Sequence, residues 1–184
     1  MPIGLDPVTL QLDAGRSLNR IAEDVSLQAK KVDRLLGSFS VTGIQRHRAH
    51  KFLLSHEWCD WHWEDLRHGD AVGLEKHWRR VAGYSFQLAP PHRHKGAGAS
   101  GPYADADSFR VFESLVLGTI PIILTGEGAL PWQGLPVVHV KNYSEITQGK
   151  LKEWWLELQP RLEWPRPYTR SLYWWHKIEK AVNA

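Results

Sequence analysis

The chain has 184 residues, 42% of them hydrophobic and 23% charged, which is typical of a soluble globular protein with one domain, or one domain plus an arm. The formal net charge of +3 suits an anionic ligand such as a nucleotide and does not demand nucleic acid. A single cysteine, Cys59, excludes an internal disulfide, and no stretch approaches the roughly 18–20 apolar residues of a membrane-spanning helix. We therefore expect a soluble chain, or the soluble end of a longer protein.

The first forty residues predict an irregular lead-in followed by a helix. Residues 1–16 show no periodicity, whereas apolar residues from Leu18 to Leu36 recur at the i, i+3, i+4 and i+7 spacing of an amphipathic helix. Ser17 can cap the start of this helix and Gly37 its end.

The next segments predict a mixture of strands and helices. Lys51 to Ser55 is short and apolar enough for a buried strand. We expect a short helix within residues 60–70 and a second helix over residues 72–83, which ends at Gly83. Tyr84 to Leu88 then predicts a strand, which Pro90 and Pro91 terminate.

The second half repeats this alternation after a Gly-rich loop at residues 92–106. We expect a helix from about Ser108 to Leu117, with Gly118 just beyond its end, and a strand from Ile120 to Leu124. A further strand is expected at residues 135–140, followed by a helix that begins at Ser144 or Thr147 and by a last helix within residues 165–182.

Short apolar strands that alternate with helices predict an α/β, Rossmann-like fold with a mostly parallel sheet and helices on both faces. We expect residues 1–40 to form a lead-in and N-terminal helix, and residues 41–184 to form the Rossmann-like domain. Ligands of such folds lie beyond the carboxyl ends of the strands. Four loops are expected there, at residues 55–58, 89–98, 125–128 and 141–145.

The stretch "DADSFRVFESLVLGTIPIIL" carries the chemistry of the predicted ligand site. Asp107 or Ser108 can cap its helix, and the unpaired N–H groups of the first turn favour a phosphate. Arg110 can bind a diphosphate through two hydrogen bonds, and Glu113, one turn further, can accept hydrogen bonds from the hydroxyls of a ribose. The alternative is an exposed i, i+3 ion pair that stabilises the helix by a few tenths of a kcal/mol.

Other loops offer weaker candidates. Thr125 and Gly126 follow a predicted strand and can contact a diphosphate, and His56 and Glu57 can contact a sugar or phosphate. The run "KGAGASG" matches neither GxGxxG nor the P-loop pattern, so a surface insertion is the alternative to a phosphate contact. The His-rich segment before residue 65 lacks HExxH and holds only one cysteine, so no metal site is expected.

Three stretches together resemble the exostosin-like glycosyltransferases: "YSFQLAPP", "DSFRVFESLVLGTIPIIL" and "LPVVHVKNYSEIT". The resemblance implies the nucleotide-sugar-binding, C-terminal half of a GT-B fold, which transfers a sugar from a UDP-sugar to a glycan acceptor. Arg110 and Glu113 match the diphosphate- and ribose-binding positions. The other matching positions are Pro90, Asp107, Gly118, Ile120, Pro121, Leu135, Pro136, Ser144 and Glu145.

The resemblance also implies what should accompany this half. The general base of such a transferase is expected on an N-terminal acceptor half, in the same or another chain, so no catalytic residue is assigned here. No permanently bound cofactor and no metal are implied, and a longer family member would lie in the Golgi lumen. The alternatives are a non-catalytic nucleotide-sugar-binding module and, less favoured because acidic residues are interspersed, a basic nucleic-acid-binding protein.

Overall fold

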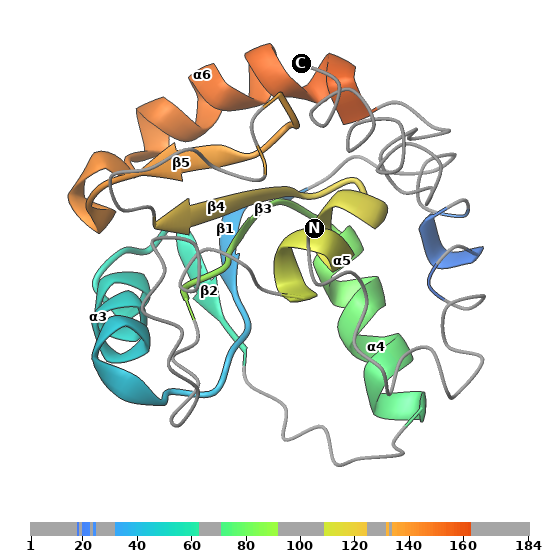
Figure 1. Cartoon of the computed structure of the whole chain (residues 1–184), viewed down its shortest axis with the longest axis horizontal. Coiled ribbons are helices and arrows are strands. Elements are labelled where there is room, and N and C mark those ends of the chain that lie inside the picture. Colours follow the sequence, from blue (N-terminus) through green and yellow to red (C-terminus); the bar gives the residue numbers. More distant parts are fainter. Residues whose placement is uncertain are drawn as a thin grey trace, which may run out of the picture.

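The computed structural model describes residues 18, 20–22, 24, 32–62, 71–91, 109–124, 132 and 134–162. These residues form a five-stranded, all-parallel sheet in the order β2-β1-β3-β4-β5, with helices packed against it (Figure 1). The predicted Rossmann-like α/β fold is therefore confirmed. The strands are β1 (Val32–Gly37), β2 (Cys59–Trp61), β3 (Tyr84–Leu88), β4 (Ile120–Leu124) and β5 (Val138–Val140). The helices are α3 (Gly43–Leu54), α4 (Ala71–Ala82), α5 (Phe109–Val116) and α6 (Gln148–Leu158), with the 3-10 turns η1 (Tyr143–Glu145) and η2 (Gln159–Leu162).

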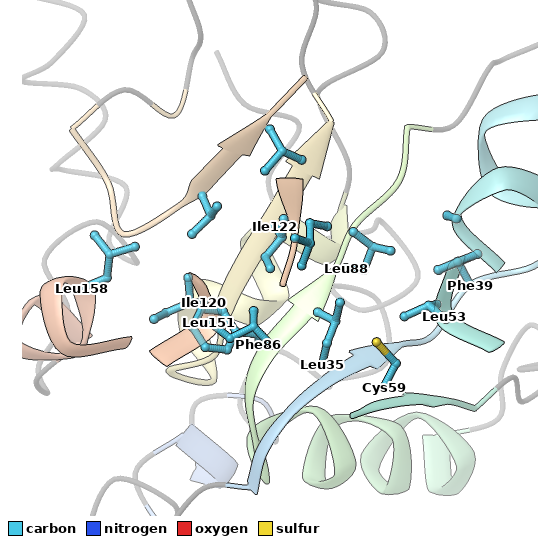
Figure 2. Close-up of a cluster of buried hydrophobic side chains, with 14 of the residues drawn as sticks. Leu35, Phe39, Leu53, Cys59, Phe86, Leu88, Ile120, Ile122, Leu151 and Leu158 are labelled. Atoms are coloured by element: carbon cyan, nitrogen blue, oxygen red, sulfur yellow. The ribbon is translucent and has the colours of Figure 1, made fainter. Parts of the chain in front are cut away.

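The sheet separates two apolar layers, because successive side chains of a strand point to opposite faces. Leu35 packs in the layer that α3 and α6 cover, and Leu36 packs in the layer that α4 and α5 cover. Figure 2 shows the first layer, with Phe86 and Ile122 from neighbouring strands between Leu53 of α3 and Leu151 of α6. Both faces of the sheet are thus buried, as in other parallel sheets.

Several predicted elements are confirmed. α4 ends just before Gly83, β3 and β4 have the expected bounds, and α5 is followed by Gly118 at φ 69°. That positive φ favours glycine and allows the chain to turn from the helix into β4. Thr147 is the N-cap of α6, and its hydroxyl accepts a hydrogen bond from the Lys150 N–H at 3.2 Å. The last predicted helix lies outside the described residues.

The predicted helix from Leu18 to Leu36 is wrong at its C-terminal end, where residues 32–37 form the interior strand β1, between β2 and β3. Adjacent apolar residues satisfy helical spacing, but here Leu35 and Leu36 are both fully buried on opposite faces of the sheet. Consecutive apolar residues are the pattern of a strand buried on both sides, and that pattern overlaps with a helical one over a short run.

The strand predicted at Lys51 to Ser55 is also wrong, because these residues form the last turn of α3 and the turn that follows it. The buried residues of α3 are Arg46, Ala49 and Leu53. Since one of the three is charged, the helix carries almost no amphipathic signal. The short helix predicted over residues 60–70 is likewise wrong at its start, because Asp60 and Trp61 belong to β2.

The strand order places a topological switch point between β1 and β3. From β1 the chain passes through α3 to β2 on one side, and then through α4 to β3 on the other side. The connections that leave the carboxyl ends of β1 and β3 therefore lead to opposite faces of the sheet. A crevice between such ends is where open α/β sheets bind their ligands.

At the β2 edge of the sheet, Arg34 and Asp60 join β1 to β2. Arg34 Nε and Nη2 donate to the two carboxylate oxygens of Asp60 at 2.6 and 2.7 Å, and the Tyr84 hydroxyl donates to Asp60 Oδ2 at 3.0 Å. The hydrogen bond from Arg34 lowers the pKa of Asp60 below its usual value. The ionised carboxylate therefore ties together three neighbouring strands.

Replacing Asp60 by Asn should lower the stability of the fold in a pH-dependent way. A carboxylate whose folded pKa is lowered stabilises the protein above its unfolded pKa of about 3.9, and this stabilisation is lost as the pH falls through the folded value. The difference in unfolding free energy between wild type and Asp60→Asn, from urea titrations, should be constant from about pH 5 to 7 and shrink below about pH 4. Glu75→Gln is the control, because Glu75 forms an exposed pair with Arg79 on α4. A pH-independent difference for Asp60→Asn would contradict this account.

Gly37, the last residue of β1, lies against α3 too closely for a side chain. A Cβ at this position would overlap with Leu53 Cδ1 and lie 3.3 Å from Leu53 Cγ and from Trp61 Cδ1. Gly37→Ala should therefore cost about 1–3 kcal/mol of stability in urea unfolding, the usual effect of overpacking. Gly149→Ala in α6 is the matched control, since its nearest neighbour would lie 3.9 Å away, and it should be neutral or stabilising by up to about 1 kcal/mol. Equal effects of the two substitutions would show that the approach of β1 to α3 is not tight.

Candidate functional site

Arg110 lies in the first turn of α5 and connects this helix to the end of β1. Its Nε donates a hydrogen bond to the carbonyl of Ser38, the first residue after β1, at 2.6 Å. Burial lowers the pKa of Arg110, and the negative charge of Glu113 raises it. The structure therefore places this guanidinium at the carboxyl end of β1, one of the two strands that border the switch point.

Glu113 lies one turn further along α5 and is only 8% exposed. Its charge acts on Arg110, so the two side chains remain electrostatically linked. The alternative for these residues was an exposed ion pair on the surface. The burial of Glu113 does not agree with that alternative.

A second arginine, Arg46, lies at the same end of the sheet and was not predicted. It belongs to the first turns of α3 and is 3% exposed. Its Nη1 donates to the Ser40 hydroxyl at 2.9 Å and lies 3.3 Å from the Ser40 carbonyl. Its Nε is buried and has no hydrogen-bond partner among the described residues.

Among the described residues, no group neutralises the charge of Arg46. Burial and the positive charge of Arg110 lower the pKa of Arg46 to about 10. In the part of the chain that the structure describes, no carboxylate forms an ion pair with it. The positive charge of Arg110 thus acts on a second guanidinium, that of Arg46, which has no counter-charge among the described residues.

The two arginines are held by one short segment, Ser38 to Ser40, that leaves β1. Arg110 reaches Ser38 from α5 and Arg46 reaches Ser40 from α3, so the side chains come from helices on opposite faces of the sheet. Such a pair can hold an anion by charge-assisted hydrogen bonds, with the first turn of α5 adding its N–H groups.

Below Arg110, buried polar residues line the α4 and α5 side of β1 and β3. The Ser38 hydroxyl lies 3.3 Å from His77 Nδ1, and the Ser114 hydroxyl contacts both the Gln87 side chain and, at 2.6 Å, the Arg110 carbonyl. Gln87 is fully buried, and its Nε2 has no partner among the described residues. Buried polar side chains therefore lie next to the candidate site, within an otherwise apolar layer.

The other predicted site residues fall into two groups. Pro90 is buried just after β3, where the preceding Ala89 N–H donates to the Ile122 carbonyl at 2.9 Å. This bond extends the pairing of β3 with β4 beyond Leu88. Asp107, Ser108, Thr125 and Gly126 lie outside the described residues, as does the Gly-rich loop.

His56 does not follow a strand, as predicted, but follows α3. It lines an open pocket of about 390 Å³ together with Phe52, Trp58, Ser144, Ile146, Thr147 and Gln148. Its ring lies 4.9 Å from that of Trp58 and 4.6 Å from that of Phe52, between centroids. The loop that follows the first strand is residues 38–42 rather than 55–58, and this is the loop that both arginines contact.

Recognition of β1 in the sequence would have led to Arg46. An arginine in the first turns of a helix that follows a strand is the same arrangement that drew attention to Arg110. Because the sequence predicts a helix that continues to Leu36 and a strand at Lys51 to Ser55, it does not mark the start of α3 as a helix N-terminus.

Within the described ranges, no three His, Cys, Asp or Glu side chains gather in a way that could hold a metal ion. No described helix has the length and apolar character needed to cross a membrane. The chain matches no protein-family model, and a search of curated proteins finds no match.

Proposed function

We propose that this domain binds a nucleotide sugar, with UDP as the expected nucleotide, and serves as the donor-binding half of a glycosyltransferase. The observation that carries this proposal is the position of Arg110 in the first turn of α5, held against Ser38 at the switch point of a parallel sheet. Phosphates bind at such helix N-termini because the N–H groups and the helix dipole favour negative charge.

The diphosphate lies over the start of α5 in this proposal, and Glu113 faces the ribose. The residues that resemble the exostosin-like glycosyltransferases form β3, α5, β4 and β5, which are the elements on the β3 side of the switch point. The acceptor is a glycan, and a Golgi lumen is the expected location for a longer protein of this type.

In the transfer reaction, an acceptor hydroxyl attacks the anomeric carbon while the bond from that carbon to the diphosphate oxygen breaks. The electron pair of this bond passes to the diphosphate, whose added negative charge is stabilised by Arg110 and the first turn of α5. The proton of the acceptor hydroxyl passes to a base on the acceptor half. The residues of this domain bind and stabilise the leaving group.

Titration calorimetry with UDP tests the donor site. The wild-type domain should bind UDP with a dissociation constant between about 1 μM and 1 mM, the range of enzyme–metabolite affinities. Arg110→Gln removes a charge-assisted bond worth about 1.5–3 kcal/mol, so the affinity should fall about 10- to 100-fold. Glu113→Ala should weaken UDP more than it weakens inorganic diphosphate, because Glu113 faces the ribose.

Glu75→Gln and Arg79→Gln on the outer surface of α4 are the controls and should bind UDP like wild type. No heat of binding with the wild-type domain, or equal binding by Glu113→Ala, would contradict the site assignment. A non-catalytic nucleotide-sugar-binding module would bind UDP in the same way. It would differ in that it would not turn over a UDP-sugar, even when an acceptor half is added.

A further inference from the structure

We propose that Arg46 is a binding residue of the same site, and that Arg46 and Arg110 together hold a phosphate-type dianion across the switch point. The inference deepens the proposed function by naming the residue that completes the phosphate contacts. It requires only the anion, however, and would stand if the nucleotide were not the ligand.

The first argument is that Arg46 is buried and has no counter-charge in the part of the chain that the structure describes. A guanidinium that is 3% exposed is removed from water, and an unpaired buried charge is strongly destabilising unless something compensates it. Ser40 satisfies Nη1, but Nε has no acceptor and no ion pair of Arg46 is present among the described residues. A bound anion would supply both the missing acceptor and the missing charge.

The second argument is the proximity of Arg110. Two positive groups at one end of a sheet repel each other, and that repulsion is felt at Arg46. The charge of Glu113 is felt at Arg110, whereas among the described residues no carboxylate offsets the positive charge at Arg46. An anion between the two guanidinium groups replaces this repulsion by two attractions.

The charge of the site favours a phosphate-type anion over a carboxylate. A phosphate monoester carries about −1.5 to −2 charges at neutral pH and three acceptor oxygens, whereas a carboxylate carries one charge. Arginine matches such an anion with its planar fork of donors. The first-turn N–H groups of α5 add donors on the same side as Arg110.

The arginines come from α3 and α5, which cover opposite faces of the sheet. An anion that contacts both therefore links the two helical layers through the Ser38 to Ser40 segment. Binding should consequently raise the melting temperature of the whole domain, because the ligand binds the folded state and not the unfolded chain.

The test is a set of Arg46 variants titrated with inorganic diphosphate, UDP and uridine at constant ionic strength. Arg46→Gln keeps a hydrogen-bonding group near Ser40 but removes the charge, and Arg46→Met removes both. Each should bind inorganic diphosphate at least about 10-fold more weakly than wild type, the loss that follows from one charge-assisted contact. Arg48→Gln and Arg48→Met are matched controls, since Arg48 is exposed on the same helix, and both should bind like wild type.

A second readout separates binding from support of the fold. If Arg46 serves the anion, Arg46→Met should melt at the same temperature as the ligand-free wild type or higher, and diphosphate should stabilise it much less than wild type. Should Arg46→Met fail to fold, Arg46→Gln supplies the affinity comparison.

The outcomes are distinguishable. Wild-type affinity for inorganic diphosphate in Arg46→Gln, or no binding of diphosphate by wild type, overturns the inference. A loss of melting temperature in both Arg46 variants with unchanged diphosphate affinity assigns Arg46 to the fold and also overturns it. Diphosphate binding that depends on Arg46, with UDP no tighter than diphosphate, supports the two-arginine site and contradicts the nucleotide proposal. UDP binding that depends on Glu113 but not on Arg46 supports the nucleotide proposal and overturns the two-arginine site.

Discussion

The burial of β1 on both faces is the constraint on which the candidate site depends. Leu35 and Leu36 anchor the strand in two separate apolar layers, and Gly37 allows Leu53 of α3 to approach the backbone directly. The strand therefore cannot shift along the sheet without exposing one layer or the other. The residues that follow it, Ser38 to Ser40, are held in place by this packing before any ligand binds, and they present their carbonyl groups to the two arginines.

A fixed backbone explains how like charges can lie close together in the folded protein. Arg46 and Arg110 are each attached to a helix whose apolar side is packed against the sheet, with Leu53 on α3 and Val111 and Leu115 on α5. The hydrophobic stabilisation from those layers offsets the repulsion between the guanidinium groups. An arrangement that lowers stability and is maintained by the surrounding core is a common feature of binding and catalytic sites, where groups are organised in advance for a ligand.

The sequence predicts the second half of the sheet more accurately than the first half, for physical reasons. In the second half, Gly118 and Thr147 mark helix boundaries, and Ile120 to Leu124 is too short and apolar to be confused with a helix. Local signals and tertiary burial agree there. In the first half, β1 and α3 are specified by what packs around them, since the strand has helical spacing and the helix buries an arginine.

The same difference determines which parts of the site were found. Arg110 and Glu113 were identified because α5 begins and ends with recognisable signals. Arg46 was missed because the sequence predicts no helix around it and a strand at Lys51 to Ser55, and because the burial of a charged residue cannot be read from a sequence. The relation between the two arginines is a tertiary property, since they are 64 positions apart and meet through the loop after β1.

The two short outer strands have a consequence for the behaviour of this protein in solution. β2 and β5 form the outer edges of the described sheet, and each is only three residues long. At β2, Asp60 is engaged with Arg34, and beyond β5 the chain turns at once into η1 and α6. A short edge offers few unpaired N–H and C=O groups to the strand of another molecule. The described sheet is therefore a poor template for the edge-to-edge pairing that begins aggregation, even though its interior strand β4 is entirely apolar.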